Sequence, residues 1–163
     1  MEIRDCSILF LTRKSRSSYE VEKHLIDKGF KKDEIEEEIR FLKEFHYLDD
    51  TGYCRRYLEQ SLEKGRSLFR IERELKERGI FFECFEEALI EAGIADKKEL
   101  ERERAVAQAK KIAAGQTLTE ALFGKIGRKL FAQGFNTDII YSAISFVRDG
   151  NDNTKSEETK WEE

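Results

Sequence analysis

The feature that most constrains this chain is one segment that recurs three times along it. Each copy has an aliphatic residue, a leucine four positions later and a glycine four positions after that: Val21, Leu25 and Gly29; Ile71, Leu75 and Gly79; Ile126, Leu130 and Gly134. The glycines are 50 and 55 residues apart. A repeat of this length is typical of stacked supersecondary units rather than of one irregular core.

Each repeat contains three segments with the hydrophobic spacing of amphipathic helices, whereas β-branched residues and sustained alternation are scarce. Proline is absent, so nothing forces a helix to break. We therefore predict an all-α fold of three tandem three-helix repeats in an elongated, curved arrangement. The predicted repeats span 1–47, 48–94 and 95–148, and a disordered acidic tail is expected at 149–163.

Polar residues and glycines mark the predicted helix ends. Ser17 and Glu20 have the spacing of a capping box, and Gly29 stands where a left-handed C-cap is expected. The other predicted starts are Asp33, Asp49 or Asp50, Ser67, Asp96, Thr117, and Asn136 or Thr137; the other predicted ends are Gly65, Gly79, Gly93, Gly115 and Gly134. In the second repeat we expect Phe85, Leu89 and Ile90 on the inner side of the last helix.

Charge is unevenly distributed along the chain, whose net charge is −4. Residues 149–163 hold six acidic and two basic side chains, and residues 31–50 hold eight acidic and four basic ones. Residues 104–135 instead hold six basic side chains against Glu120 alone. This pattern is not that of a general nucleic-acid binder, although the basic stretch has the charge to contact phosphates or an acidic protein surface.

The three cysteines, Cys6, Cys54 and Cys84, are widely spaced and form no CxxC pair, which favours reduced, buried thiols in a cytoplasmic protein. No N-terminal signal peptide is evident, and no apolar run approaches the roughly 20 residues that a membrane span needs. We expect a cytoplasmic protein with no membrane contact.

No arrangement of residues predicts catalysis. The acidic groups Glu36–Glu38, Asp49–Asp50 and Glu83 with Glu86–Glu87 are expected to be solvated helix faces or caps. His24 and His46 have no metal-ligand partner three or four residues away, and no phosphate-binding glycine loop is present. We predict a protein that is not an enzyme, with no cofactor and no metal.

Three helices with a glycine turn before the last also invite comparison with helix-turn-helix proteins. In the first two repeats, however, the last helix carries mostly glutamates, which would repel DNA phosphates. Sequence-specific reading of DNA is therefore disfavoured.

Three motifs resemble a known family. The segment from Arg13 to Gly29, with its Arg-Ser pair and helical spacing, resembles the opening repeat of the bacterial regulatory protein RecX. Tyr47-Leu48-Asp49-Asp50, the later Lys64-Gly65-Arg66, and Ile71 to Ile80 are similar to its central repeat. Lys129 to Ile140 is similar to its final repeat, so the resemblance covers about residues 3–148.

The resemblance implies a function. Family members modulate the RecA recombinase in DNA repair, recombination and the SOS response: they bind the groove of the RecA–DNA filament and limit its extension, ATP hydrolysis and strand exchange. By resemblance we expect a monomer whose partner is the RecA filament, with weak contact to DNA phosphates within it. The candidate contact residues are the basic side chains expected to be exposed, namely Arg13, Arg16, Arg66, Lys125, Arg128 and Lys129.

Two alternatives remain open. A helical-repeat adaptor for another protein would be favoured by an apolar concave face. A direct DNA-binding protein would be favoured if the basic residues of the third repeat converge on one surface.

Overall fold

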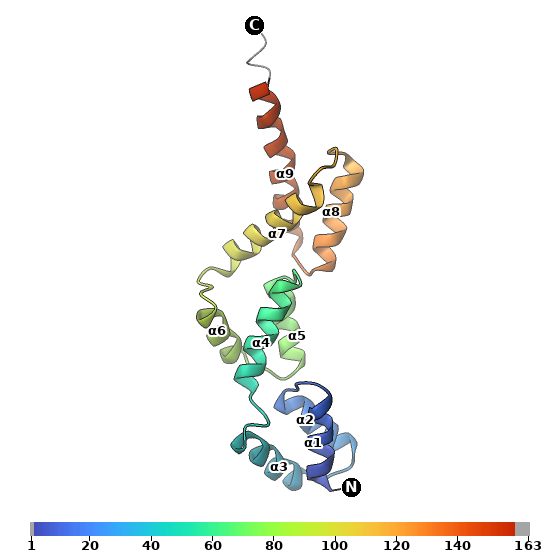
Figure 1. The fold of residues 1–163 in the computed structure, drawn as a ribbon, viewed down its shortest axis with the longest axis vertical. Helices are drawn as coiled ribbons and strands as arrows, with labels where there is room; N and C mark the ends of the chain where they lie inside the picture. The colour runs from blue at the N-terminus through green and yellow to red at the C-terminus, as the bar shows by residue number, and fades with distance from the viewer. Residues whose placement is uncertain (1, 159–163) are drawn as a thin grey trace. The chain divides into compact units, whose positions relative to one another are not determined.

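The structure is a computed structural model that describes the backbone of residues 2–158 and the side chains of residues 2–150. Within that range it contains nine α-helices and no β-strand, which confirms the all-α prediction (Figure 1). The helices are α1 (Ile3–Arg13), α2 (Ser18–Asp27), α3 (Lys32–Glu44), α4 (Asp50–Glu63), α5 (Leu68–Glu77), α6 (Phe82–Glu91), α7 (Lys97–Ala113), α8 (Glu120–Ala132) and α9 (Thr137–Glu158).

The chain divides into two compact units. The N-terminal unit contains the residues up to Gln60 and Ile71–Gly93, and the C-terminal unit contains Ser61–Arg70 and the residues from Ile94 onward. The C-terminal unit thus includes the end of α4, the start of α5 and the turn between them. The predicted repeat boundaries at 47, 94 and 148 stay a prediction, with three helices beginning in each predicted repeat.

The first three helices share one apolar core of Cys6, Val21, Leu25, Ile35, Leu42 and Leu48. The predicted capping box at the start of α2 is confirmed: the Glu20 backbone N–H donates to Ser17 Oγ, and the Glu20 carboxylate accepts from the Ser17 N–H. Gly29 has a φ of +86°, so the predicted left-handed end of α2 is also confirmed.

The acidic face predicted on α3 is wrong at one position. Glu38 is only 2% exposed, and its carboxylate accepts from Ser7 Oγ at 2.6 Å and from Arg4 Nε at 3.0 Å. Glu38 lies three residues after Ile35 and four before Leu42, so helical geometry puts it on the buried side of α3. The ion pair and the serine hydroxyl compensate for the removal of this charge from water.

The core of the C-terminal unit lies between α7, α8 and α9, which pack together in Figure 1. Its buried members are mainly alanines on α7 and larger apolar side chains on α8 and α9: Ala105, Ala109, Leu122, Phe123, Ile126, Leu130, Phe135, Ile140 and Ala143. The small alanines let the long helix α7 approach its neighbours closely.

Several predicted helix boundaries shift by a few residues. Helix α3 begins at Lys32, with Asp33 in its first turn, and α8 is capped by Thr119 rather than Thr117. Asp49, Asp96 and Asn136 cap α4, α7 and α9 through their side-chain oxygens. Ile90 is 74% exposed, so its predicted burial is wrong.

Helix α9 continues to Glu158, past the predicted end of the last repeat at 148. The predicted tail at 149–163 falls largely outside the described part, because side chains after 150 and the whole of residues 159–163 are not described.

Candidate functional site

The N-terminus of α2 contacts the C-terminal turn of α5 within the N-terminal unit. Ser17, fully buried, donates from Oγ to the Arg78 carbonyl at 2.6 Å while the same oxygen caps α2. Gly79 follows with a φ of +69°, and a Cβ at that position would overlap the Tyr19 side chain. The cap of one helix is therefore also a contact to the next predicted repeat.

A related contact occurs one repeat later, within the C-terminal unit, with a backbone N–H as the donor in place of the serine hydroxyl. The Ser67 N–H donates to the Gln133 carbonyl at 3.0 Å, and Arg70 Nη1 donates to the Ala132 carbonyl at 2.8 Å. A Cβ on Gly134 would lie 2.6 Å from Arg70 Cβ and 2.9 Å from Ser67 Oγ. These two junctions explain why the serine and the glycine recur at the same positions of successive repeats.

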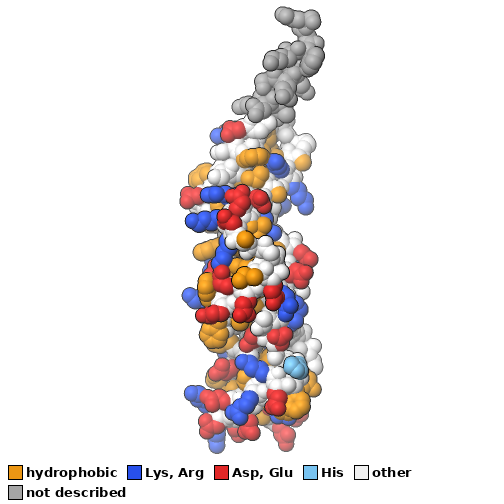
Figure 2. All heavy atoms as spheres, turned by 90° about the vertical axis from the view of Figure 1, so that its left-hand side faces the viewer, with side chains coloured by type: hydrophobic (Ala, Val, Ile, Leu, Met, Phe, Trp, Pro, Cys, Tyr) orange, Lys and Arg blue, Asp and Glu red, His pale blue; other side chains and the backbone are white. Residues whose placement is uncertain are grey.

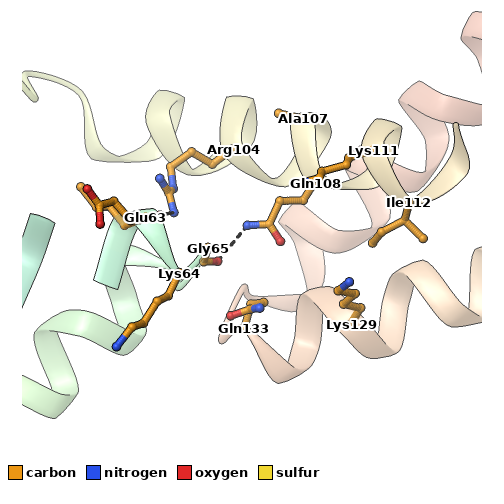
Figure 3. Close-up of a pocket in the computed structure, with 11 residues that line it drawn as sticks. Glu63, Lys64, Gly65, Arg104, Ala107, Gln108, Lys111, Ile112, Lys129 and Gln133 are labelled. Atoms are coloured by element: carbon orange, nitrogen blue, oxygen red, sulfur yellow. Dashed lines mark hydrogen bonds between the residues drawn. The ribbon is translucent and has the colours of Figure 1, made fainter. Parts of the chain in front are cut away.

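The turn between α4 and α5 forms one wall of a basic cleft in the C-terminal unit, with a volume of about 520 Å³ (Figure 3). Helices α7 and α8 form the other walls. We call this surface the basic cleft; its lining residues are Leu62, Glu63, Lys64, Gly65, Arg104, Ala107, Gln108, Lys111, Ile112, Lys129 and Gln133.

Side chains of α7 hold the α4 end of the basic cleft in place. Arg104 Nη2 donates to the carbonyls of Leu62 and Arg66 at 2.9 and 3.0 Å, and Gln108 Nε2 donates to the Gly65 carbonyl at 2.8 Å. The Leu62 carbonyl belongs to the last turn of α4, where backbone acceptors lack intrahelical donors and the dipole is negative, whereas Gly65 and Arg66 lie in the turn that follows. The Arg104 guanidinium thus donates both to the end of α4 and to the α4–α5 turn.

A buried carboxylate supports the same wall. Glu101 Oε1 accepts from the Leu68 N–H at 2.6 Å, at the start of α5. Burial raises the pKa of Glu101, whereas the Leu68 hydrogen bond and the Arg104 charge oppose that rise. Burial likewise lowers the pKa of Arg104, and the charge of Glu101 opposes this effect. The pair fixes the turn that carries Lys64.

The remaining charges of the cleft are three lysines, Lys64, Lys111 and Lys129, all exposed, against the single acid Glu63. Within the described part of the chain, none of the three lysines forms an ion pair. In Figure 3 the Lys129 side chain points from α8 towards Gln108 and Ile112 of α7, whereas Lys64 points away from α7. The surface is suited to binding anionic groups of a partner.

The comparisons with known proteins decide the family. A family model described as "RecX, first three-helix domain" matches residues 4–42. The chain is 30% identical over 143 residues to the regulatory protein RecX of Vibrio parahaemolyticus, an alignment that covers 88% of this chain and 90% of that protein. The chain belongs to the RecX family.

Other relatives extend the RecX match. The regulatory protein RecX of Clostridium botulinum is 30% identical over 148 residues, covering 88% of this chain and 68% of that protein. The crystal structure of RecX from Lactobacillus salivarius superposes with a TM-score of 0.66 at 25% identity, covering 88% of this chain and 92% of that one. The fold is therefore that of the RecX regulatory proteins.

The contact residues predicted from the RecX resemblance are divided between the two units. Arg13 is exposed at the end of α1, and Arg16 is half-buried, 3.3 Å from Glu20 and stacked over Phe10. Arg66 is also half-buried, and its Nη1 donates to Ser61 Oγ at 3.5 Å. The expected exposure of Arg16 and Arg66 is therefore wrong.

The other three predicted residues lie on α8, where Lys125, Arg128 and Lys129 are all exposed. Only Lys129 lines the basic cleft. Arg128 folds back along the helix, so that its Nη1 would lie 3.3 Å from a Cβ on Gly124.

Sequence analysis missed two of the cleft lysines as site residues. Lys64 stands in the most specific RecX motif, and Lys111 belongs to the basic stretch 104–135, but neither is among the predicted contact residues. Their proximity depends on the packing of the α4–α5 turn against α7, which no spacing along the chain reveals.

No group of three or more His, Cys, Asp or Glu side chains in the described part could hold a metal ion. None of the helices, over the residues described, has the length and hydrophobicity to cross a lipid bilayer.

Proposed function

We propose that this chain regulates the RecA recombinase by binding in the groove of the RecA–DNA filament and inhibiting filament extension, ATP hydrolysis and strand exchange. The observation that carries the proposal is membership of the RecX family of regulatory proteins over nearly the whole chain. Successive helical units suit a partner that is itself a repeating polymer, because several modest contacts made at once gain avidity.

The charges of the two units support a partner that consists of both protein and nucleic acid. The N-terminal unit, over residues 1–60 and 71–93, has 21 acidic and 15 basic side chains. Residues 61–70 and 94–150 of the C-terminal unit have 13 basic and eight acidic ones. Opposite excess charges on one chain are complementary to a filament made of protein and nucleic acid.

The test is a titration of RecA ATPase on single-stranded DNA with the full chain. Inhibition is expected at substoichiometric ratios, because a protein that blocks filament growth affects many protomers from few sites. Replacing Lys125, Arg128 and Lys129 by alanine should weaken filament binding by about 1–3 kcal/mol if they meet phosphate or carboxylate groups. No inhibition at any ratio would contradict the proposal.

Two outcomes favour the alternatives. Inhibition only at ratios that coat the DNA would indicate a direct DNA-binding protein, an alternative favoured by the meeting of Lys64, Lys111 and Lys129 at one cleft. Tight binding to another protein without any effect on RecA would indicate a helical-repeat adaptor.

A further inference from the structure

We propose that the basic cleft binds phosphate groups of a nucleic-acid strand, with Lys111 and Lys129 as the principal contacts and Lys64 at the margin. The inference rests on the proposed function for its setting, a protein that acts on a DNA filament. It goes further by assigning the phosphate contact to one cleft, and its test needs no RecA.

The cationic groups of the cleft differ in whether they already have partners within the protein. Arg104 already donates to two backbone carbonyls, and Gln108 donates to a third. The Leu62 carbonyl at the negative end of α4 and the Gly65 and Arg66 carbonyls of the following turn therefore have side-chain donors and do not need the lysines. Lys111 and Lys129 remain exposed and without an acidic partner among the described residues. Their charges are available to a ligand.

The second step is the shape of the surface. A concave wall concentrates the field of its charges more than a convex helix face does. The volume of about 520 Å³ lies within the range of ligand-binding clefts, and lysines come from three separate elements: the α4–α5 turn, α7 and α8. On the face drawn in Figure 2, by contrast, acidic and basic side chains are interspersed.

The third step is the choice between phosphate and carboxylate. Arginine binds carboxylates and phosphates alike through a planar fork of two parallel hydrogen bonds, but the guanidinium in this cleft is committed to backbone carbonyls. The free donors are ammonium groups, which bind phosphate as point charges. Leu62, Ala107 and Ile112 add apolar wall for sugars or bases.

The fourth step is the charge of residues 61–70 and 94–150, the part of the C-terminal unit that precedes the acidic segment 151–163. The excess of five positive charges over residues 61–70 and 94–150 attracts a polyanion, whereas the N-terminal unit, with an excess of six negative charges, repels one. A nucleic-acid strand therefore meets a favourable field at the unit that contains the cleft.

The experiment measures the anisotropy of a labelled oligothymidylate titrated with the full chain at several salt concentrations, without RecA. The Lys111→Ala/Lys129→Ala variant should lose about tenfold in affinity at low salt, and its salt slope should fall by about 1.4, since each phosphate contact to a single strand contributes about 0.7. Lys111→Arg/Lys129→Arg keeps the charges and should keep the slope.

The matched control is Lys98→Ala/Lys110→Ala, which removes the same charge from exposed positions of α7 outside the cleft. This control should bind DNA nearly as the unmodified chain does. Equal losses in both variants would show that only total charge matters and would overturn the assignment, as would unchanged binding of Lys111→Ala/Lys129→Ala.

A second arm uses labelled poly-glutamate. If the cleft variant loses affinity for poly-glutamate but not for DNA, the cleft binds an acidic protein segment and the phosphate assignment is wrong. If RecA is inhibited while DNA binding does not depend on Lys111 and Lys129, the proposed function stands and this inference fails. If DNA binding depends on these lysines but RecA is not inhibited, this inference stands and the proposed function fails.

Discussion

At the scale of single residues, Gly29 and Gly79 have similar backbones but different surroundings. Both have positive φ, +86° and +69°. A Cβ on Gly29 would meet nothing within 4 Å, whereas one on Gly79 would overlap Tyr19. Substitutions at the two glycines therefore distinguish the backbone strain of a left-handed residue from a steric clash at the junction between α2 and α5.

We predict that Gly79→Ala destabilises the protein more than Gly29→Ala. Gly29→Ala should lower the free energy of unfolding by about 1 kcal/mol, the usual effect of a Cβ in the left-handed region. Gly79→Ala should lower it by about 1–3 kcal/mol more, because a packed side chain must move. Urea denaturation of both variants measures the difference.

Removing the clash provides the control. In a Tyr19→Gly background the two alanine substitutions should have nearly equal effects, because Tyr19 Cβ and Cγ, the atoms that a Cβ on Gly79 would overlap, are both gone. Equal effects in the unmodified background would contradict a close approach of Tyr19 to Gly79.

The sequence predicts some residue environments and not others. The repeating glycines predict their own left-handed turns, since few other residues adopt positive φ. The burial of Glu38 also follows from its spacing to Ile35 and Leu42. Glu38 belongs to a run of three glutamates, however, and such a run favours the interpretation of a solvated helix face. The sequence does not predict that Lys111 and Lys129 line one cleft, because this depends on how two separate helices pack.

At the scale of helices, one serine both caps a helix and joins it to the next predicted repeat. Ser17 Oγ accepts from the Glu20 N–H and donates to the Arg78 carbonyl, whereas Thr119 is an exposed cap that accepts from the Leu122 N–H. The two caps thus differ mainly in the contact beyond their own helix.

We predict that Ser17→Ala lowers the free energy of unfolding by about 2 kcal/mol and Thr119→Ala by about 1 kcal/mol. Each loses a cap of about 1 kcal/mol, and Ser17→Ala also removes a donor to a carbonyl at a buried junction. Thermal and urea denaturation provide the comparison. A smaller effect at Ser17 than at Thr119 would show that the Arg78 contact adds no stability.

The junctions also explain where the repeat pattern changes. Aligning Val21, Ile71 and Ile126 places Leu122 in the third repeat where the first two have Ser17 and Ser67. Leu122 is a buried core residue of α8, and the cap moves to Thr119. The repeat pattern therefore predicts α2, α5 and α8, the middle helix of each predicted repeat, correctly. It does not predict that α8 begins differently, with Thr119 as its cap.

At the scale of the whole molecule, the net charge of −4 conceals separate regions of opposite sign. Residues 151–163 carry five acidic and two basic side chains and follow, within the C-terminal unit, residues 94–150 with their basic excess. Like charges repel over about 10 Å at an ionic strength of 0.1 M. The acidic segment should therefore oppose the approach of a nucleic-acid strand to this protein.

We predict that deleting residues 151–163 strengthens binding to oligothymidylate at low salt by about twofold to eightfold. A unit charge about 10 Å away in water changes binding by about twofold, and the segment has an excess of three negative charges. The gain should disappear near 1 M salt, where screening acts over about 3 Å. The unfolding temperature should stay within about one degree, because the segment has few apolar residues.

A full-length variant separates charge from length. Replacing the five acids, Asp152, Glu157, Glu158, Glu162 and Glu163, by their amides keeps the chain but removes its negative charges. This variant should bind DNA as tightly as the deletion or more tightly, because both lysines of the segment remain. Unchanged affinity in both variants would contradict electrostatic repulsion by the segment. A clear fall in the unfolding temperature of the deletion alone would instead indicate that Trp161 contributes to packing.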